Sequence, residues 1–210
     1  ADGMGGHKAG QVASHLAAEG SIRAIEALQG ASVSLAERLR HAVACANREI
    51  FRAAQAKPEL FGMGTTFVGM LFGGDRLALA HVGDSRAYLL RQGRLHSLTD
   101  DHSVVGELLR RHEISEADAA QHPHRHVLTR ALGTRPRTAP DLAEMTPQEG
   151  DVFIMCSDGL TGFVDDKEIT EHLMSEPDLE AAAAALVDTA NRAGGQDNIT
   201  VLLVRYEKEA

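Results

Sequence analysis

The amino-acid sequence predicts an α+β fold with a substantial antiparallel sheet. Helical periodicity dominates the beginning of the 210-residue chain, short strand-like segments separated by glycine turns follow, and helices with isolated strands complete it. The regular alternation of strands and helices that is typical of a Rossmann fold is missing. The first glycines do not predict a dinucleotide-binding loop, since no predicted strand precedes them and no acidic partner follows at the required spacing.

Two helices are expected at the start of the chain, over residues 8–28 and 34–55. The first is rich in alanine and has few larger apolar side chains. These larger residues are Val12, Leu16, Ile22 and Ile25. The second has apolar residues at helical spacing, with Ser34 as its N-cap and Glu37 completing a capping box.

A run of short strands follows the helices. The strand-like segments are residues 65–72, 76–82, 86–91 and 94–98. Because Gly73-Gly74, Gly83-Asp84 and Gln92-Gly93 separate them, we expect one antiparallel meander. The remaining expected elements are a helical stretch at 103–121, a buried strand at 152–156, an alanine-rich helix at 179–192 and a final strand at 199–205.

Composition and charge exclude some classes of function. The net charge of -9 argues against a nucleic-acid-binding protein that neutralises phosphates broadly. No apolar run reaches the roughly 20 residues that cross a bilayer, so no membrane span is expected. The first residues have neither the basic nor the apolar region of a signal peptide. With only Cys45 and Cys156, far apart in the sequence, a reducing cytoplasmic setting is expected, although a single disulfide stays an alternative.

Three aspartates share one context, beside glycine at a predicted strand end. Asp2 precedes a glycine-rich segment, Asp158 follows the strand at 152–156, and Asp197 precedes the final strand. Carboxylate oxygens are the ligands that Mg²⁺ and Mn²⁺ prefer. Each site taken alone is explained better by an ordinary turn, because aspartate and glycine are common turn residues.

The ordered set of motifs carries more information than any single one. The motifs are DGMGGH at residues 2–7, GMGTT at 62–66, HVGDSR at 81–86, TDDHS at 99–103, HP at 122–123, LTRALG at 128–133, SDGLT at 157–161 and GQDNIT at 195–200. Together, and in this order, they closely resemble the type 2C, metal-dependent protein phosphatase family, particularly its compact bacterial members. The resemblance spans nearly the whole chain.

The resemblance implies a β-sandwich of two mainly antiparallel sheets, flanked by helices on both faces, with the metals at one end. It also implies a set of metal ligands. The aspartate matching Asp2 bridges two Mn²⁺ or Mg²⁺ ions, and those matching Asp158 and Asp197 complete the ligands of one ion. The backbone carbonyl matching Gly3 contacts the other ion. Asp84 matches a ligand of a third, weaker metal that is shared with Asp158.

Other residues are candidates for catalysis or for support of the site. His7 is a candidate general acid for the departing serine or threonine oxygen, because histidine titrates near neutral pH. The alternative is a helix-start residue with at most an indirect water contact. Thr65, with its neighbour Thr66, and Arg130 are interpreted as support for the site. Arg86 either holds Asp84 or pairs on the surface.

Two further types of site are disfavoured. The alternating histidines of residues 122–126 are compatible with zinc, but the resemblance interprets His122-Pro123 as part of a loop near the active site. A cysteine-dependent phosphatase is disfavoured because Cys156 leads directly into Ser157-Asp158 without a phosphate-cradling loop.

In the family, a further segment precedes the one that matches Asp2-Gly3. It supplies a strand, an acidic ligand of the second metal and an arginine for the substrate phosphate. We therefore expect one catalytic domain over residues 1–210 that lacks this segment, either as a fragment or by loss. The isolated chain is then expected to be poorly stable and weakly active, because a sandwich that lacks a strand exposes an unpaired edge.

The function implied is hydrolysis of phosphoserine and phosphothreonine in proteins. A water activated by two metals attacks the phosphomonoester directly, without a phosphoenzyme. The implied partners are phosphoproteins, with a cognate kinase and its substrates. The alternatives are a pseudophosphatase that binds phosphoproteins without catalysis, and a Mg²⁺- or Mn²⁺-dependent hydrolase of small phosphate esters.

Overall fold

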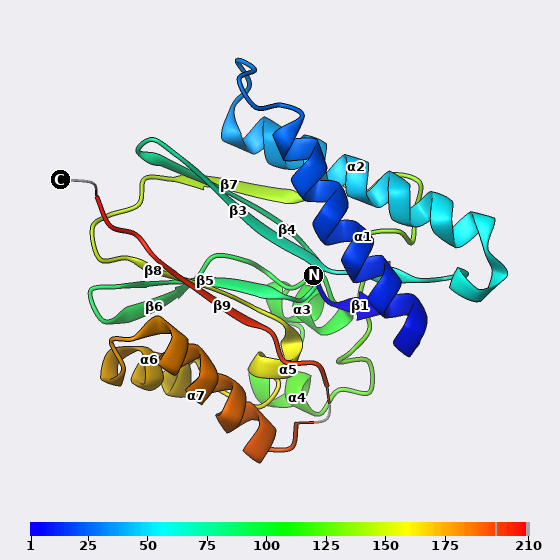
Figure 1. The fold of residues 1–210 in the computed structure, drawn as a ribbon. Coiled ribbons are helices and arrows are strands. Elements are labelled where there is room, and N and C mark those ends of the chain that lie inside the picture. Colours follow the sequence, from blue (N-terminus) through cyan, green and yellow to red (C-terminus); the bar gives the residue numbers. More distant parts are fainter. Residues whose placement is uncertain (196, 209–210) are drawn as a thin grey trace. The chain divides into compact units, whose positions relative to one another are not determined.

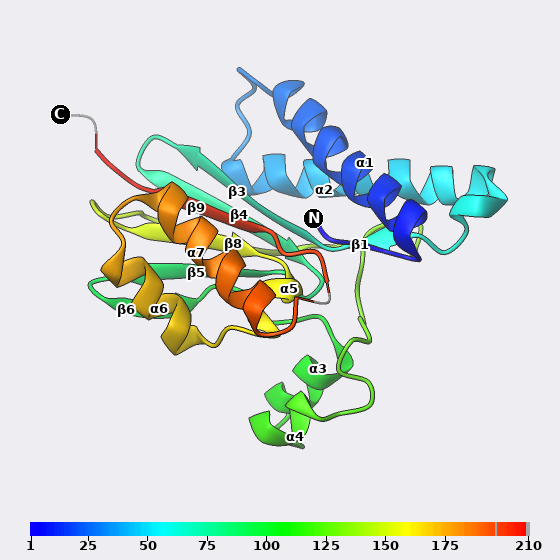
Figure 2. The same ribbon diagram turned by 60° about the horizontal axis from the view of Figure 1, so that its bottom comes forward.

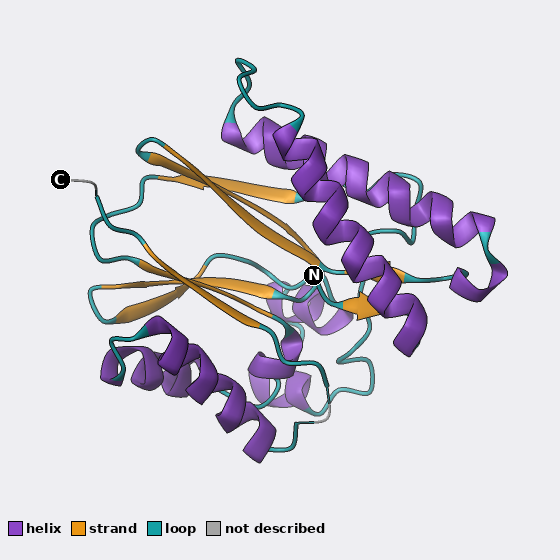
Figure 3. Ribbon diagram, in the orientation of Figure 1, coloured by secondary structure: helices purple, strands orange, loops and turns teal. Residues whose placement is uncertain are grey.

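The computed structural model describes residues 1–195 and 197–208, apart from the side chain of His7. The chain divides into two compact units. The first comprises residues 1–84 and 100–145, and the second comprises residues 85–99 and 146–210. The predicted α+β class is confirmed, because each unit contains an antiparallel sheet flanked by helices (Figures 1 and 3). That residues 1–210 form a single domain stays a prediction.

The first unit contains a three-stranded antiparallel sheet, in the order β3-β4-β7, and a two-stranded one, β1-β2. Its strands are β1 (Gly3–Met4), β2 (Gly64–Thr65), β3 (Phe67–Gly73), β4 (Arg76–Val82) and β7 (Asp141–Met145). Its helices are α1 (His7–Glu26), α2 (Leu35–Ala56), the 3₁₀ turn η1 (Pro58–Leu60), α3 (Val104–Arg110) and α4 (Glu116–Ala120). Within this unit, α3 and α4 project away from the β3-β4-β7 sheet (Figure 2).

Helix α1 packs on α2 through small residues. Ala13 and Ala17 are fully buried, whereas the larger Val12 and Ile22 are 37% and 57% exposed. Alanine lets the two helices approach closely, so Ala13 and Ala17 form the centre of the buried face of α1. Leu16 and Ile25 are partly buried and pack against the same core. The N-cap prediction for α2 is confirmed, since Ser34 accepts the Glu37 N–H at 3.2 Å. The Glu37 carboxylate pairs with Arg40, whereas the capping box had predicted a bond back to the N-cap backbone.

The second unit contains a four-stranded antiparallel sheet in the order β6-β5-β8-β9. Its strands are β5 (Arg86–Arg91), β6 (Arg94–Ser97), β8 (Val152–Cys156) and β9 (Val201–Arg205). Its helices are α5 (Asp158–Thr161), α6 (Asp166–Ser175) and α7 (Leu179–Arg192). Its apolar core joins Tyr88 and Ile154 of the sheet to Ile169 and Leu186 of the helices.

The prediction of one continuous meander is wrong. The β3-β4 and β5-β6 hairpins form, but β4 pairs next with β7 and β5 pairs with β8. Gly83, between β4 and β5, has φ 110° and binds His102 through its N–H, so the chain leaves the first sheet here instead of turning back. No local pattern in the sequence predicted β7 or α6, and the helical stretch expected at 103–121 forms two short helices, α3 and α4.

Candidate active site

Asp2 is held by two threonines of the first unit. Its N–H donates to the Thr66 hydroxyl at 2.8 Å, and the Thr66 N–H donates to the Asp2 carbonyl at 2.9 Å. The Thr65 hydroxyl donates to the same carbonyl at 2.7 Å. These bonds fix the backbone of Asp2 and leave its half-buried carboxylate to other contacts. Through its bond to the Asp2 carbonyl, Thr65 fixes the position of Asp2. The role of Asp2 as a metal ligand stays a prediction.

Glycine is needed where this segment meets α1. A Cβ atom on Gly3 would lie 1.9 Å from the Gly10 carbonyl oxygen, so only glycine lets the helix approach the strand this closely. Helix α1 begins at His7. The His7 side chain lies outside the described part of the structure, so its role as general acid stays a prediction.

Buried Asn47 of α2 stabilises the loop beside Thr65. Thr65 and Leu132 exchange backbone hydrogen bonds at 2.9 and 3.1 Å. Asn47, 1% exposed, accepts the Gly133 N–H at 2.8 Å and donates to the Arg135 carbonyl at 3.1 Å. The support for Asp2 therefore extends through Thr65 to α2. Nothing in the sequence marked Asn47 for this role, because its partners lie more than 80 residues away.

The turn that carries Asp84 is fixed by His102. The His102 Nδ1 accepts the Gly83 N–H at 3.1 Å, and the His102 backbone N–H donates to the Gly83 carbonyl at 2.8 Å. Because Nδ1 accepts, Nε2 carries the proton and donates to Asp141 Oδ2 at 3.1 Å. Asp141 also pairs with Arg130, so Arg130 acts on this turn only through Asp141 and His102.

Burial sets the charges of this network. It lowers the pKa of His102, and burial together with the adjacent His102 ring lowers the pKa of His81 to about 4. The two rings lie 4.4 Å apart, and His81 Nε2 is buried without a hydrogen-bond partner among the described residues. Burial favours the neutral form of Asp141, but hydrogen bonds from Arg130 and His102 outweigh it and lower its pKa. At neutral pH the network consists of two neutral histidines and one ion pair.

In the second unit, Ser157 and Gly159 bring the segments of Asp158 and Asp197 together. The Ser157 hydroxyl donates to the Asn198 carbonyl at 2.9 Å and accepts the Thr200 N–H at 3.0 Å. A Cβ atom on Gly159 would lie 2.5 Å from the Asn198 oxygen, so glycine is required there. Gln196 lies outside the described residues. Sequence reasoning quoted Ser157 within a motif but gave it no role.

The Asp158 carboxylate fits a cation ligand. Its Oδ1 is buried and has no hydrogen-bond partner among the described residues. A buried carboxylate oxygen without a partner costs free energy, and a hard cation is one partner that removes this cost. The exposed Asp197 accepts the Asn198 N–H at 2.7 Å through Oδ1, which leaves lone pairs on its carboxylate. These carboxylates and the Gly3 carbonyl are the oxygen donors that Mg²⁺ and Mn²⁺ take.

The histidines of residues 122–126 form a local turn. The His122 and His124 rings lie 5.7 Å apart, and the His124 N–H donates to His122 Nδ1 at 3.1 Å. Across the described residues, no three histidine, cysteine, aspartate or glutamate side chains are grouped closely enough to hold a metal without rearrangement.

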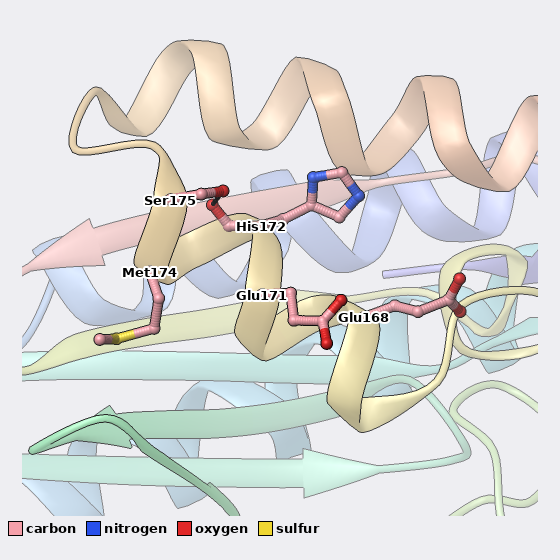
Figure 4. Close-up of a pocket in the computed structure, with 5 residues that line it drawn as sticks. All are labelled: Glu168, Glu171, His172, Met174 and Ser175. Carbon is pink, nitrogen blue, oxygen red and sulfur yellow. Dashed lines mark hydrogen bonds between the residues drawn. The ribbon is translucent and has the colours of Figure 1, made fainter.

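One cavity lies in each unit. The larger, about 610 Å³, runs along α6 and is lined by Glu168, Glu171, His172, Met174 and Ser175, with none of the predicted site residues (Figure 4). In it, His172 is directed toward α7, where its Nε2 lies 3.1 Å from the Thr189 hydroxyl. The second, about 320 Å³, belongs to the first unit and includes Arg130 and Asp141.

Solved bacterial serine/threonine phosphatases share the fold. The crystal structure of the Mycobacterium tuberculosis serine/threonine phosphatase PstP/Ppp matches with a TM-score of 0.89 and 40% identity, over 99% of this chain and 86% of that one. The catalytic domain of PstP in complex with two manganese ions matches with a TM-score of 0.86 and 38% identity, over 98% and 85% of the two chains.

The sequence comparison gives the same class. The family model for protein phosphatase 2C matches residues 1–199. The serine/threonine phosphatase stp of Listeria monocytogenes is 43% identical over 213 residues, which cover 99% of this chain and 83% of that protein. The chain therefore belongs to the protein phosphatase 2C family, as its ordered motifs predicted.

Proposed function

We propose that this chain hydrolyses phosphoserine and phosphothreonine in proteins with the help of Mn²⁺ or Mg²⁺. The observation that carries the proposal is the buried Asp158 Oδ1, which lacks a hydrogen-bond partner in the described structure and suits a cation. Membership of the protein phosphatase 2C family and the serine/threonine phosphatases among its relatives support the enzyme over a pseudophosphatase. The manganese-bound PstP structure supports the choice of metal.

The proposed ligands are all oxygen donors. They are the Asp2 carboxylate, the Gly3 carbonyl and the carboxylates of Asp158 and Asp197. When bound, the cations lower the pKa of a water and offset the negative charge that spreads over the transferred phosphoryl group. Thr65 and Thr66 hold Asp2, as Ser157 and Gly159 hold the segments of the other two aspartates.

Asp84 is proposed as a ligand of a third, weaker metal. Its turn is positioned by His102, whose ring binds the preceding Gly83 N–H. No protein nucleophile is needed, because the attacking group is water. Cys156 is buried in β8 and Cys45 is a partly buried thiol of α2, and neither forms a disulfide among the described residues. Both have structural environments unlike a phosphate-cradling loop.

Phosphoproteins are the proposed partners, together with a cognate kinase and its substrates. The family assignment and the names of the relatives support phosphoprotein substrates. Neither cysteine forms a disulfide within the described residues, which is compatible with the proposed cytoplasmic location. No helix within the described residues is both long enough and apolar enough to span a bilayer.

Phosphopeptide hydrolysis tests this function. The full-length protein is assayed with and without Mn²⁺, as wild type and as Asp158→Asn, Asp197→Asn and Asp188→Asn. Asp188 is an exposed aspartate of α7 and serves as the control for removal of a charge from the same unit. We expect metal-dependent turnover that both ligand variants lose and Asp188→Asn keeps. Metal-independent turnover, or faster hydrolysis of phosphotyrosine than of phosphothreonine, would overturn the proposal.

A further inference from the structure

A basic cavity lies beside the segment that supports Asp2. This cavity of about 320 Å³, here called the Arg135 pocket, is lined by residues of the first unit. The lining residues are Thr129, Arg130, Ala131, Thr134, Arg135, Arg137, Thr138, Ala139 and Asp141. Three arginines and one aspartate give it a positive charge in a chain whose net charge is -9.

Two of these arginines have no acidic partner within the described part of the chain. Arg130 is paired with Asp141, which leaves Arg135 and Arg137 to supply the excess positive charge. Both are exposed, and neither side chain forms an ion pair or hydrogen bond among the residues that the structure describes. A guanidinium presents a planar set of donors that matches the oxygens of a carboxylate or phosphate.

The loop that carries the two arginines is held in place before any ligand arrives. Buried Asn47 binds the Gly133 N–H and the Arg135 carbonyl at 2.8 and 3.1 Å. Pro136 fixes its own φ and restricts the conformation of Arg135. Binding therefore costs less ordering entropy than it would on a mobile loop.

Contacts inside the first unit link the pocket to Asp2. A Cβ atom on Gly64 would lie 2.9 Å from the Leu132 oxygen and 3.0 Å from Thr134 Cγ2, so the pocket wall packs directly on β2. In β2, Gly64 pairs with Met4 of β1, and Thr65 bonds the carbonyl of Asp2. The pocket is thus built on the strand pair that positions the predicted ligand.

We propose that the Arg135 pocket binds an anionic side chain of the substrate that lies near the scissile phosphoresidue in the sequence. Arg135 and Arg137 supply the charge, and the ligand is either an acidic residue or a second phosphorylated residue. The proposal rests on the phosphatase function argued above, and it makes this loop a determinant of substrate specificity.

Three phosphothreonine peptides of otherwise identical sequence test the pocket. One has neutral neighbours, one has aspartates and one has a phosphoserine a few residues away. For the full-length wild type with Mn²⁺, we expect kcat/KM to be about tenfold higher for at least one anionic peptide than for the neutral one, mainly through KM. The preference should weaken as ionic strength rises. A preference for only one anionic peptide supports the pocket and identifies the source of the anion.

Arginine variants complete the test. The double variant Arg135→Gln/Arg137→Gln should reduce the anionic-to-neutral ratio of kcat/KM to about one to two. Arg76→Gln/Arg94→Gln removes the same charge from two exposed arginines of the β3-β4 and β5-β6 hairpins and should keep the ratio. Three results would overturn the proposed role of the pocket. They are an unchanged anionic-to-neutral ratio of kcat/KM in the pocket variant, an equal fall of this ratio in the control variant, and no preference of the wild type for an anionic peptide. Failure to hydrolyse the neutral peptide would instead contradict the phosphatase function itself.

Discussion

In the first unit, side chains hold the candidate site residues through hydrogen bonds to backbone groups far away in the sequence. Thr66 binds Asp2 across 64 residues, and His102 binds Gly83 across 19. In the second unit, two backbone segments approach directly, because Gly159 has no side chain to separate them. We therefore expect the turn of Asp84 to be sensitive to loss of the His102 side chain, and the segment of Asp158 to be sensitive to added volume at Gly159.

The largest effect is expected for Gly159→Ala. The new Cβ would lie 2.5 Å from the Asn198 oxygen, so the segment that carries Asp197 must move away from Asp158. A misplacement of about 1 Å in a catalytic group can reduce turnover by about 100-fold, and we expect a loss of kcat of at least this size. Steady-state phosphopeptide kinetics measure it, with circular dichroism to verify folding. Wild-type turnover in a folded variant would show that the close approach has no role.

A smaller loss is expected for His102→Ala in the first unit. The variant removes the acceptor for the Gly83 N–H and loosens the turn that carries Asp84. We expect kcat to fall by roughly 30-fold and the Mn²⁺ concentration for half-maximal activity to rise, because the proposed ligand Asp84 becomes mobile. His102→Asn offers an acceptor near the place of Nδ1 and should recover part of both. A loss of kcat with an unchanged Mn²⁺ dependence in both variants would limit His102 to a structural role.

Asp151 provides a stability control in the second unit. Its buried carboxylate accepts two hydrogen bonds from Arg91, at 2.8 and 2.6 Å, and the Gln148 N–H at 2.8 Å. Asp151→Asn removes the charge but keeps the shape, and should lower the free energy of unfolding by about 2 kcal/mol. Urea denaturation measures this change, and kcat at saturating Mn²⁺ should stay within about twofold of wild type.

The lowered pKa of Asp151 should also make the free energy of unfolding depend on pH. Burial favours its neutral form, but the bonds from Arg91 and the Gln148 N–H outweigh burial and lower its pKa. The ionised carboxylate therefore stabilises the folded state at pH values above 3.8, the ordinary pKa of an aspartate. This stability is lost as the pH falls through the lowered pKa of Asp151. Urea midpoints of wild type and Asp151→Asn should converge in that acidic range. Midpoints that stay equally far apart would contradict the sign of the shift.

The smallest effect concerns His81 in the first unit. Burial and the adjacent His102 lower its pKa from 6.5 to about 4, so the unfolded state takes up a proton first as pH falls. Stability is thus full above 6.5 and declines toward pH 4, by about 1 kcal/mol between pH 6.5 and 5.5. His81→Leu should flatten this part of the stability profile. An equally steep decline in the variant would assign the proton uptake to another group.

The sequence predicted local features better than distant contacts. The N-cap Ser34 and the limits of β4, β8 and α7 follow from spacing and capping within one segment, and the structure confirms them. The β4–β7 pairing and the His102–Asp141 bond join residues tens of positions apart with no local signal, so they were missed.

In the candidate site, too, the sequence predicted local motifs but not contacts between distant residues. Ordered motifs identified the family and predicted the aspartates as ligands, because each motif is a short run of residues. They could not show that Asn47 clamps the loop at Gly133, or that Ser157 ties the segments of Asp158 and Asp197 together. Those roles depend on burial and on bonds between distant segments.

Direct Mn²⁺ binding to the full-length protein tests the central claim, that the buried Asp158 Oδ1 is a metal ligand. Electron paramagnetic resonance of free Mn²⁺ during a titration gives the dissociation constants without any turnover. We predict that Asp158→Asn weakens at least one Mn²⁺ site by tenfold or more, while Asp188→Asn binds like wild type. Wild-type Mn²⁺ affinity in a folded Asp158→Asn protein would contradict the account.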